Sequence, residues 1–114
     1  MVLNKNNSHH YKWGDNCDSW VFVDKENLVV KMESMPSGTK ESIHFHSKAG
    51  QFFFVLSGNA SFYIEDIQKI VKEQEGIFVA PNVPHYIANE NDIKLDFLVI
   101  SQPSTNGDRK DIKK

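Results

Sequence analysis

The sequence predicts an all-β fold, an antiparallel sandwich or barrel. Apolar residues alternate at period two along most of the chain, as they do in strands. Turn residues (Gly, Pro and Asn) separate these runs at short, regular intervals. The only stretch with a trace of helical spacing is "EDIQKIVKEQE", and a strand at 69–72 fits the hairpin rhythm better.

Strands are expected at 20–23, 28–35, 42–46, 51–57, 60–65, 69–72, 77–80, 85–89 and 93–101. The polar turn "DKEN" separates the first two, and "PSGTK" ends the second. The third and fourth are joined by "SKAG", which has the composition of a hairpin loop.

The later strands have equally clear boundaries. Gly58-Asn59 is expected to form a tight turn before 60–65. "EQEG" precedes 77–80, and "PNVP" separates that strand from 85–89. In the last strand, 93–101, four alternating apolar residues share one face.

Length and composition indicate one globular domain. The 114 residues are expected to form a single domain, 1–114, with the barrel at about 11–103 and flexible polar ends. His9 and His10 lie in the first of these ends and are expected to be unstructured. The net charge of -2 offers no basic field for nucleic acid or an anionic membrane.

The expected location is the cytoplasm. The first 16 residues lack the apolar core of a secretory signal, and no apolar run approaches the roughly 20 residues of a spanning helix. Cys17 is the only cysteine, so it has no partner within the chain, which fits a reducing compartment. A lone thiol with no basic neighbour is expected to be inert.

The stretch "IHFHSKAGQFFF" carries the first candidates for chemistry. Residues i and i+2 of a strand point to the same face, so His44 and His46 project together. Two imidazoles at that spacing can converge on one metal ion. Paired strand histidines serve equally well as hydrogen-bonding or solvent-facing residues, so the fragment alone leaves both interpretations open.

Two further residues extend this group. Gln51 opens the next strand, and an antiparallel return would bring its amide beside the two histidines. His85 follows the rigid "PNVP" turn at the start of another strand. Three histidines and an amide oxygen could therefore meet inside a barrel.

At these residues the sequence resembles the cupin superfamily, as a small single-domain member of the cupin 2 type. The first family motif is Gly, five residues, HxH, three or four residues, Glu, six residues and Gly. Gly38, His44, His46 and Gly58 match it at full spacing, and Gln51 stands at the Glu position.

The second family motif pairs a turn with a His and, four residues later, an Asn. "APNVPHYIAN" supplies His85 and Asn89, with Asn82 in place of the turn Gly. Asn82 is a suitable replacement because Asn tolerates the left-handed conformation better than most residues. The Gly that usually begins this motif would fall at Gln74, so the start of the motif matches poorly.

The resemblance implies a double-stranded β-helix, that is, a jelly-roll barrel with one metal ion in its mouth. By position, His44, His46 and His85 would be ligands and Gln51 would fill the fourth place. The ion would be a divalent transition metal (Fe, Mn, Ni, Zn or Cu), in keeping with the preferences of neutral imidazole. An amide in place of a carboxylate leaves the ion its full +2 charge and makes it a better Lewis acid. The alternatives are that Gln51 hydrogen-bonds a water on the metal or a histidine, or that the barrel holds no metal.

The run "QFFFVL" is apolar on both faces. Phe53 would line the barrel, while Phe52, Phe54 and Leu56 would lie on the outer face. A strand apolar on both faces is covered on both faces. Because cupins often dimerise through such surfaces, a homodimer is expected; packing within one chain is the competing explanation.

No residue stands out as a catalytic acid or base, so the catalytic residues stay unknown at this point. Glu33, Glu41 and Tyr63 are candidates, but carboxylates in such positions are usually solvated. Trp13 and Trp20 would either cap the pocket mouth or belong to the core.

Two functions are weighed for a barrel that binds a small molecule. The first is a metal-dependent enzyme, of dioxygenase or isomerase type, acting on a small oxygenated molecule. The second is a non-catalytic module that binds or senses a small ligand, suggested by the missing carboxylate and base. A structural metal that only stabilises the barrel is a third possibility.

Overall fold

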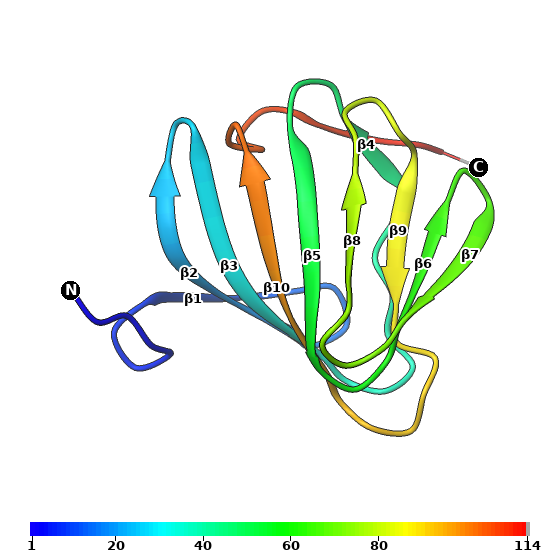
Figure 1. Cartoon of the computed structure of the whole chain (residues 1–114), viewed down its shortest axis with the longest axis horizontal. Coiled ribbons are helices and arrows are strands. Elements are labelled where there is room, and N and C mark those ends of the chain that lie inside the picture. Colours follow the sequence, from blue (N-terminus) through cyan, green and yellow to red (C-terminus); the bar gives the residue numbers. More distant parts are fainter. Residues whose placement is uncertain (114) are drawn as a thin grey trace.

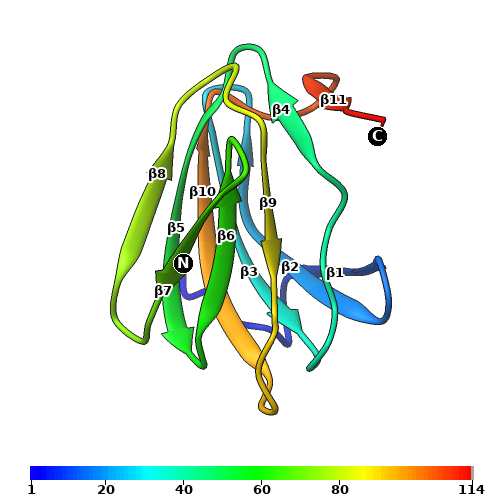
Figure 2. The ribbon, with the colours of Figure 1, turned by 90° about the vertical axis from the view of Figure 1, so that its right-hand side faces the viewer.

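Two antiparallel sheets that face each other make up the structure, a computed structural model that describes residues 1–113 (Figures 1 and 2). None of these residues is helical, which confirms the all-β prediction. Accordingly, residues 1–113 contain no helix long and apolar enough to cross a membrane. Figure 1 shows the strands drawn together at the bottom of the view and fanned apart at the top.

The larger sheet has six strands in the order β1-β2-β3-β10-β5-β8. They are β1 (His9–Trp13), β2 (Cys17–Lys25), β3 (Leu28–Met35), β5 (Gly50–Ser57), β8 (Gly76–Val79) and β10 (Leu95–Gln102). The smaller sheet has the order β11-β4-β9-β6-β7. Its strands are β4 (His44–His46), β6 (Ala60–Ile64), β7 (Ile67–Val71), β9 (His85–Ala88) and β11 (Arg109–Asp111).

From β3 onward the chain alternates between the two sheets, with only the β6–β7 hairpin staying in one of them. This repeated crossing is the topology of a jelly roll and confirms the predicted double-stranded β-helix. The strand predicted at 28–35 has those bounds in the structure, and the other predicted strands overlap observed ones with shifts at their ends.

Aromatic side chains from both sheets form the core. The Phe53 ring of β5 lies 4.9 Å from Phe62 of β6 and 6.1 Å from Phe97 of β10, measured between ring centroids. All three rings are buried, as are Val55 and Ile87. Burial of each such side chain contributes about 1.5–3 kcal/mol, so this layer holds the two sheets together below the wide end.

The turns of the predicted motifs adopt the left-handed conformation. Positive φ angles occur at Gly38 (81°), Gly58 (87°) and Asn82 (69°), and Gly58 has no room for a side chain because an added Cβ would lie 2.7 Å from the Lys94 carbonyl oxygen. The expectation for Asn82 is confirmed. Gln74 also has a positive φ (64°), so the chain keeps the turn where the motif match was poor and does so without a glycine.

The expectation of loose ends at residues 1–10 and after 103 is wrong in two places. β1 begins at His9 and pairs with β2, while β11 pairs with β4. Most side chains of β1 and all those of β11 are exposed, so neither strand shows an alternating apolar pattern. Main-chain pairing and a few side-chain contacts, such as that of Trp13 with the core, place them in the sheets, and neither signal is visible in the sequence.

The outer face of the larger sheet carries exposed aromatic side chains. Phe52 of β5 and Phe78 of β8 are 38% and 63% exposed, although the sequence pattern led us to expect a covered face. Phe53 points into the core, as expected. The expected homodimer, which would cover Phe52, stays a prediction.

Candidate metal centre and its cavity

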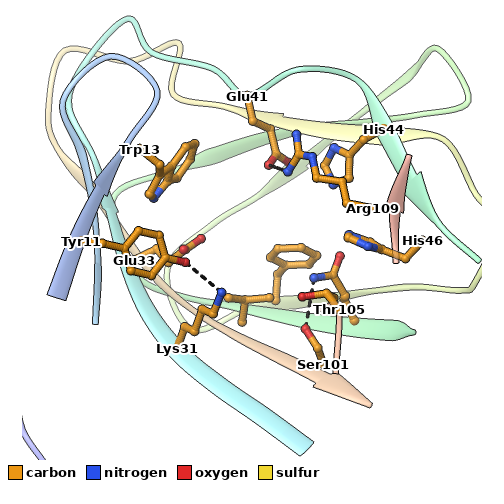
Figure 3. Close-up of a pocket in the computed structure, with 13 residues that line it drawn as sticks. Tyr11, Trp13, Lys31, Glu33, Glu41, His44, His46, Ser101, Thr105 and Arg109 are labelled. Atoms are coloured by element: carbon orange, nitrogen blue, oxygen red, sulfur yellow. Dashed lines mark hydrogen bonds and ion pairs between the residues drawn. The ribbon is translucent and has the colours of Figure 1, made fainter. Parts of the chain in front are cut away.

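A cavity of about 290 Å³ lies between the two sheets (Figure 3). It is lined by Tyr11, Trp13, Lys31, Glu33, Glu41, His44, His46, Gln51, Phe53, Val99, Ser101, Thr105 and Arg109. A cavity of this size is at the lower limit for small-molecule sites, so it suits a ligand of few atoms.

Two buried histidines, His44 and His46, line this cavity, and a third, His85, lies next to them. His44 and His46 alternate on β4 and so share a face, and His44 is directly opposite His85 in the pairing of β4 with β9. Each is at most 5% exposed. One ring nitrogen from each of the three lies within 4.8 Å of the others, so the three side chains could hold a metal ion.

Backbone carbonyls fix the orientation of two of these rings. Nδ1 of His44 is 2.8 Å from the Ser42 carbonyl oxygen, and Nδ1 of His85 is 2.8 Å from that of Val83. Both Nδ1 atoms therefore donate, which leaves Nε2 with its lone pair free. Among residues 1–113, Nε2 of His85 has no hydrogen-bond partner although it is buried.

The protonation state of the histidines suits a metal ligand. Burial lowers the pKa of His44 to about 3 and that of His46 to about 4, and it also lowers the pKa of His85. All three rings are therefore neutral near pH 7, the form in which imidazole binds a metal.

Gln51 reaches the cavity from the opposite sheet. Its Nε2 donates to Ser101 Oγ on the neighbouring strand β10 over 3.1 Å. Its Oε1 is buried and has no hydrogen-bond partner among the described residues. An amide held by its nitrogen, with a free and buried oxygen, has the donor atom that a metal ligand needs.

Two carboxyl groups that were expected to be solvated also line the cavity. Glu33 is on β3, and Glu41 lies in the loop between β3 and β4. Figure 3 shows them on different walls of the cavity. A signal for Glu33 was available in the sequence: Lys31 and Glu33 share a strand face with Val29 and Met35, which are buried.

The environment of Glu41 favours its neutral form. Burial raises its pKa to about 8, while the nearby Arg109 opposes this shift and Glu33 adds to it. Oε1 accepts a hydrogen bond from the Ile87 amide at 3.0 Å. The other oxygen, Oε2, lies 3.8 Å from Arg109 Nη1 and has no short polar contact with the residues that the structure describes. Burial likewise raises the pKa of Glu33.

The remaining candidates have structural roles or lie elsewhere. Trp13 and Trp20 were expected either to cap the pocket mouth or to belong to the core. Trp13 lines the cavity, whereas Trp20 does not line it and its ring lies 5.2 Å from that of His10. The Tyr63 hydroxyl donates to Glu90, and no part of Tyr63 lines the cavity. Burial raises the pKa of Cys17, in keeping with the expected inert thiol.

Comparison with known proteins agrees with the architecture of a two-sheet barrel. Residues 31–101 match the cupin domain, and the chain belongs to that family. This confirms the resemblance inferred from the two motifs.

Similar proteins cover much of the chain. An uncharacterized protein of Methanocaldococcus jannaschii is 28% identical over 69 residues, which is 60% of this chain and 55% of the relative, so the match spans about half the relative's length. A predicted oxalate decarboxylase from Thermotoga maritima has a TM-score of 0.83 at 16% identity, over 91% of this chain and 100% of that one. Pac13, a nucleoside dehydratase from Streptomyces, has a TM-score of 0.81 at 19% identity, over 99% and 91%. At these identities the two structures show the shared fold alone.

Gln51→Glu is expected to tighten the binding of divalent metal by about 10- to 100-fold, because the new carboxylate would neutralise one of the two charges of the ion. Competition titration against a chelator of known affinity measures the change. Gln68→Glu on β7, outside the cavity, is the matched control and should leave the affinity unchanged. Equal affinity of the Gln51→Glu variant and the wild type would show that residue 51 does not contact the metal.

Proposed function

We propose that the protein is a metal-dependent enzyme of isomerase type that moves a proton on a small oxygenated molecule. The carrying observation is that two half-buried carboxyl groups, Glu33 and Glu41, line the same cavity as His44, His46 and Gln51, three of the candidate metal ligands. Carboxyl groups whose pKa is raised in a cavity are typical of acid–base catalysis, which supports an enzyme over a binding module.

The proposed metal ligands are His44, His46, His85 and Gln51. Neutral imidazoles, the free Nε2 of His85 and the free amide oxygen of Gln51 support this set. When bound, a divalent transition metal would act as a Lewis acid that polarises a carbonyl of the substrate.

Glu41 is proposed as the residue that exchanges a proton with the substrate. Its raised pKa is close to neutral pH, where a group both gives and takes a proton efficiently. The Ile87 amide holds Oε1, which leaves Oε2 as the oxygen proposed to exchange the proton. Glu33, on another wall of the cavity, is the proposed second acid or base, because an isomerisation removes a proton at one atom and returns it at another.

This residue set favours isomerase over dioxygenase chemistry within the expected enzyme class. Proton transfer needs paired acid–base groups in the cavity, whereas a dioxygenase does not depend on them. Of the structurally similar proteins, Pac13 is a nucleoside dehydratase, and dehydration, like isomerisation, involves no net oxidation. That parallel is consistent with the proposal and does not carry it.

The test begins with elemental analysis of the purified protein after loading with each candidate metal. Metal-loaded protein is then incubated in D₂O with small hydroxy ketones and 2-oxo acids, and NMR follows deuterium incorporation. We expect exchange that chelation abolishes. Ligand binding without exchange would favour the non-catalytic binding module instead, and absence of metal under every loading condition would refute the metal site.

A further inference from the structure

The segment after β10 crosses the wide end of the barrel and supplies part of the cavity wall. Figure 1 shows it, in orange to red, running over the ends of the strands at the top of the view. Thr105 and Arg109 of this segment line the cavity. We call residues 103–112 the C-terminal strap.

Two sets of contacts hold the strap in place. Arg109 pairs with His46, and Asp111 with His44, in the main-chain register of β11 and β4. Next to Arg109, the Asp108 carboxylate accepts hydrogen bonds over 2.6–3.2 Å from the Ser47 hydroxyl and from the backbone amides of Ser47, Lys48 and Ala49. Asp108 is only 5% exposed, so these contacts fix the backbone on which Arg109 stands.

The guanidinium of Arg109 faces the cavity with its two terminal nitrogens weakly engaged. Nε makes the one short contact, 2.8 Å to Asp111 Oδ1. Nη1 is 3.8 Å from Glu41 Oε2, and Nη2 is 3.4 Å from the Ser42 carbonyl oxygen. Figure 3 shows the group beside His44 and His46. Two open donors on a planar fork match the two oxygens of a carboxylate.

The charge of the cavity also favours an anion. Lys31 on β3 supplies a second cation at the wall where Tyr11 lies, and its Nζ donates to the Tyr11 hydroxyl over 2.8 Å. Burial shifts both cavity carboxyls, Glu33 and Glu41, toward their neutral forms. Asp111 is the close carboxylate partner of Arg109 through Nε, whereas the two carboxyls on the cavity side of Arg109 and Lys31 are the ones shifted toward their neutral forms.

We propose that Arg109 binds a carboxylate of the substrate, that Asp108 is the positioning residue that holds Arg109 at the cavity, and that the substrate is a small carboxylic acid. The inference rests on the proposed function and deepens it by naming the substrate class. The strap then contributes a substrate-binding residue to the site. Selectivity for carboxylic acids resides in the strap rather than in β4 and β9, the strands that carry the histidines.

Calorimetry with malonate and its neutral counterpart malonamide tests the proposal on metal-loaded protein. Wild type is expected to bind malonate and to bind malonamide at least about tenfold more weakly. Arg109→Ala should weaken malonate binding by about 10- to 100-fold, the usual effect of losing a bidentate charged contact. Free guanidinium at millimolar concentration should restore part of the affinity, and Lys110→Ala, at the exposed neighbouring position of β11, should change nothing.

Asp108→Asn tests the positioning role. We expect a smaller loss of malonate affinity, about 3- to 10-fold, with unchanged metal content. In the Asp108→Asn background, Arg109→Ala should cost less than it does in the wild type, because the guanidinium is already displaced. Fully additive effects would contradict the role of Asp108.

The failure of this inference is distinct from failure of the proposed function. Equal malonate affinity of Arg109→Ala and wild type overturns the inference, as do equal binding of malonamide or no binding of malonate at all. Malonate binding that disappears on chelation but survives Arg109→Ala would assign the anion to the metal alone. Absence of metal or of proton exchange, with Arg109-dependent malonate binding intact, would instead refute the proposed function.

Discussion

Glu41→Gln is expected to lower the rate of substrate proton exchange by about 10²- to 10⁴-fold, the usual contribution of a positioned acid or base. Glutamine keeps the shape of the side chain and an oxygen that can accept from the Ile87 amide. It has no exchangeable carboxyl proton. Deuterium incorporation followed by NMR measures the rate, and elemental analysis should find the metal content unchanged. Glu26→Gln, an exposed glutamate outside the cavity, is the control.

The same variant has a readout that does not depend on activity. Burial raises the pKa of Glu41 from 4.5 to about 8, so between these values the folded state binds more protons than the unfolded state. The free energy of unfolding of metal-free protein should therefore fall as pH rises from about 4.5 to about 8. Denaturant titrations across that range should show a smaller fall for Glu41→Gln than for the wild type. Parallel curves would mean that Glu41 is not buried in solution, and exchange unaffected by the substitution would exclude it as the proton carrier.

His85→Ala is expected to lower the affinity for divalent metal by at least about 100-fold, because it removes one of the three neutral imidazoles whose nitrogens converge within 4.8 Å. Competition with a chelator measures the affinity. The variant should also lose the rise in melting temperature that metal gives the wild type, since only a ligand that binds the folded state stabilises it.

Because His85 is buried, its replacement also removes packing, so metal-free wild type and variant must both be melted as a reference. His9→Ala removes an exposed imidazole from β1 and should leave metal affinity unchanged. Full metal affinity of a folded His85→Ala variant would show that the trio is not the binding site.

The fold and the positions of the candidate ligands could be read from local patterns. Period-two alternation and turn residues predicted nearly all the central strands, and the left-handed turn at Asn82 followed from the properties of Asn. His44 and His46 share a face because any strand places i and i+2 together. The edge strands β1 and β11 were missed because their side chains are mostly exposed and show no alternating apolar pattern.

The placement of Glu33 and Glu41 in the cavity could not be predicted for a related reason. Carboxylates at such positions are usually solvated. The partial burial of Glu33 and Glu41 depends on what the opposite sheet and the strap place over them. Lys31 is another charged residue that would be expected to face solvent. Its position on the same strand face as the buried Val29 and Met35 indicates instead that it faces the cavity. A charged residue in a strand is read as exposed unless the tertiary structure covers it.

The sequence by itself determined the all-β class, the cupin family and the spacing of His44, His46, Gln51 and His85, because these depend on strand periodicity and turn chemistry within short segments. Only the tertiary structure decided which charged groups face the histidines. Glu33, Glu41 and Arg109 come from β3, a loop and the C-terminal strap, and they meet only once the two sheets close and Asp108 fixes the strap across the wide end. No local pattern encodes such a meeting, since it depends on contacts between segments that are far apart in the chain.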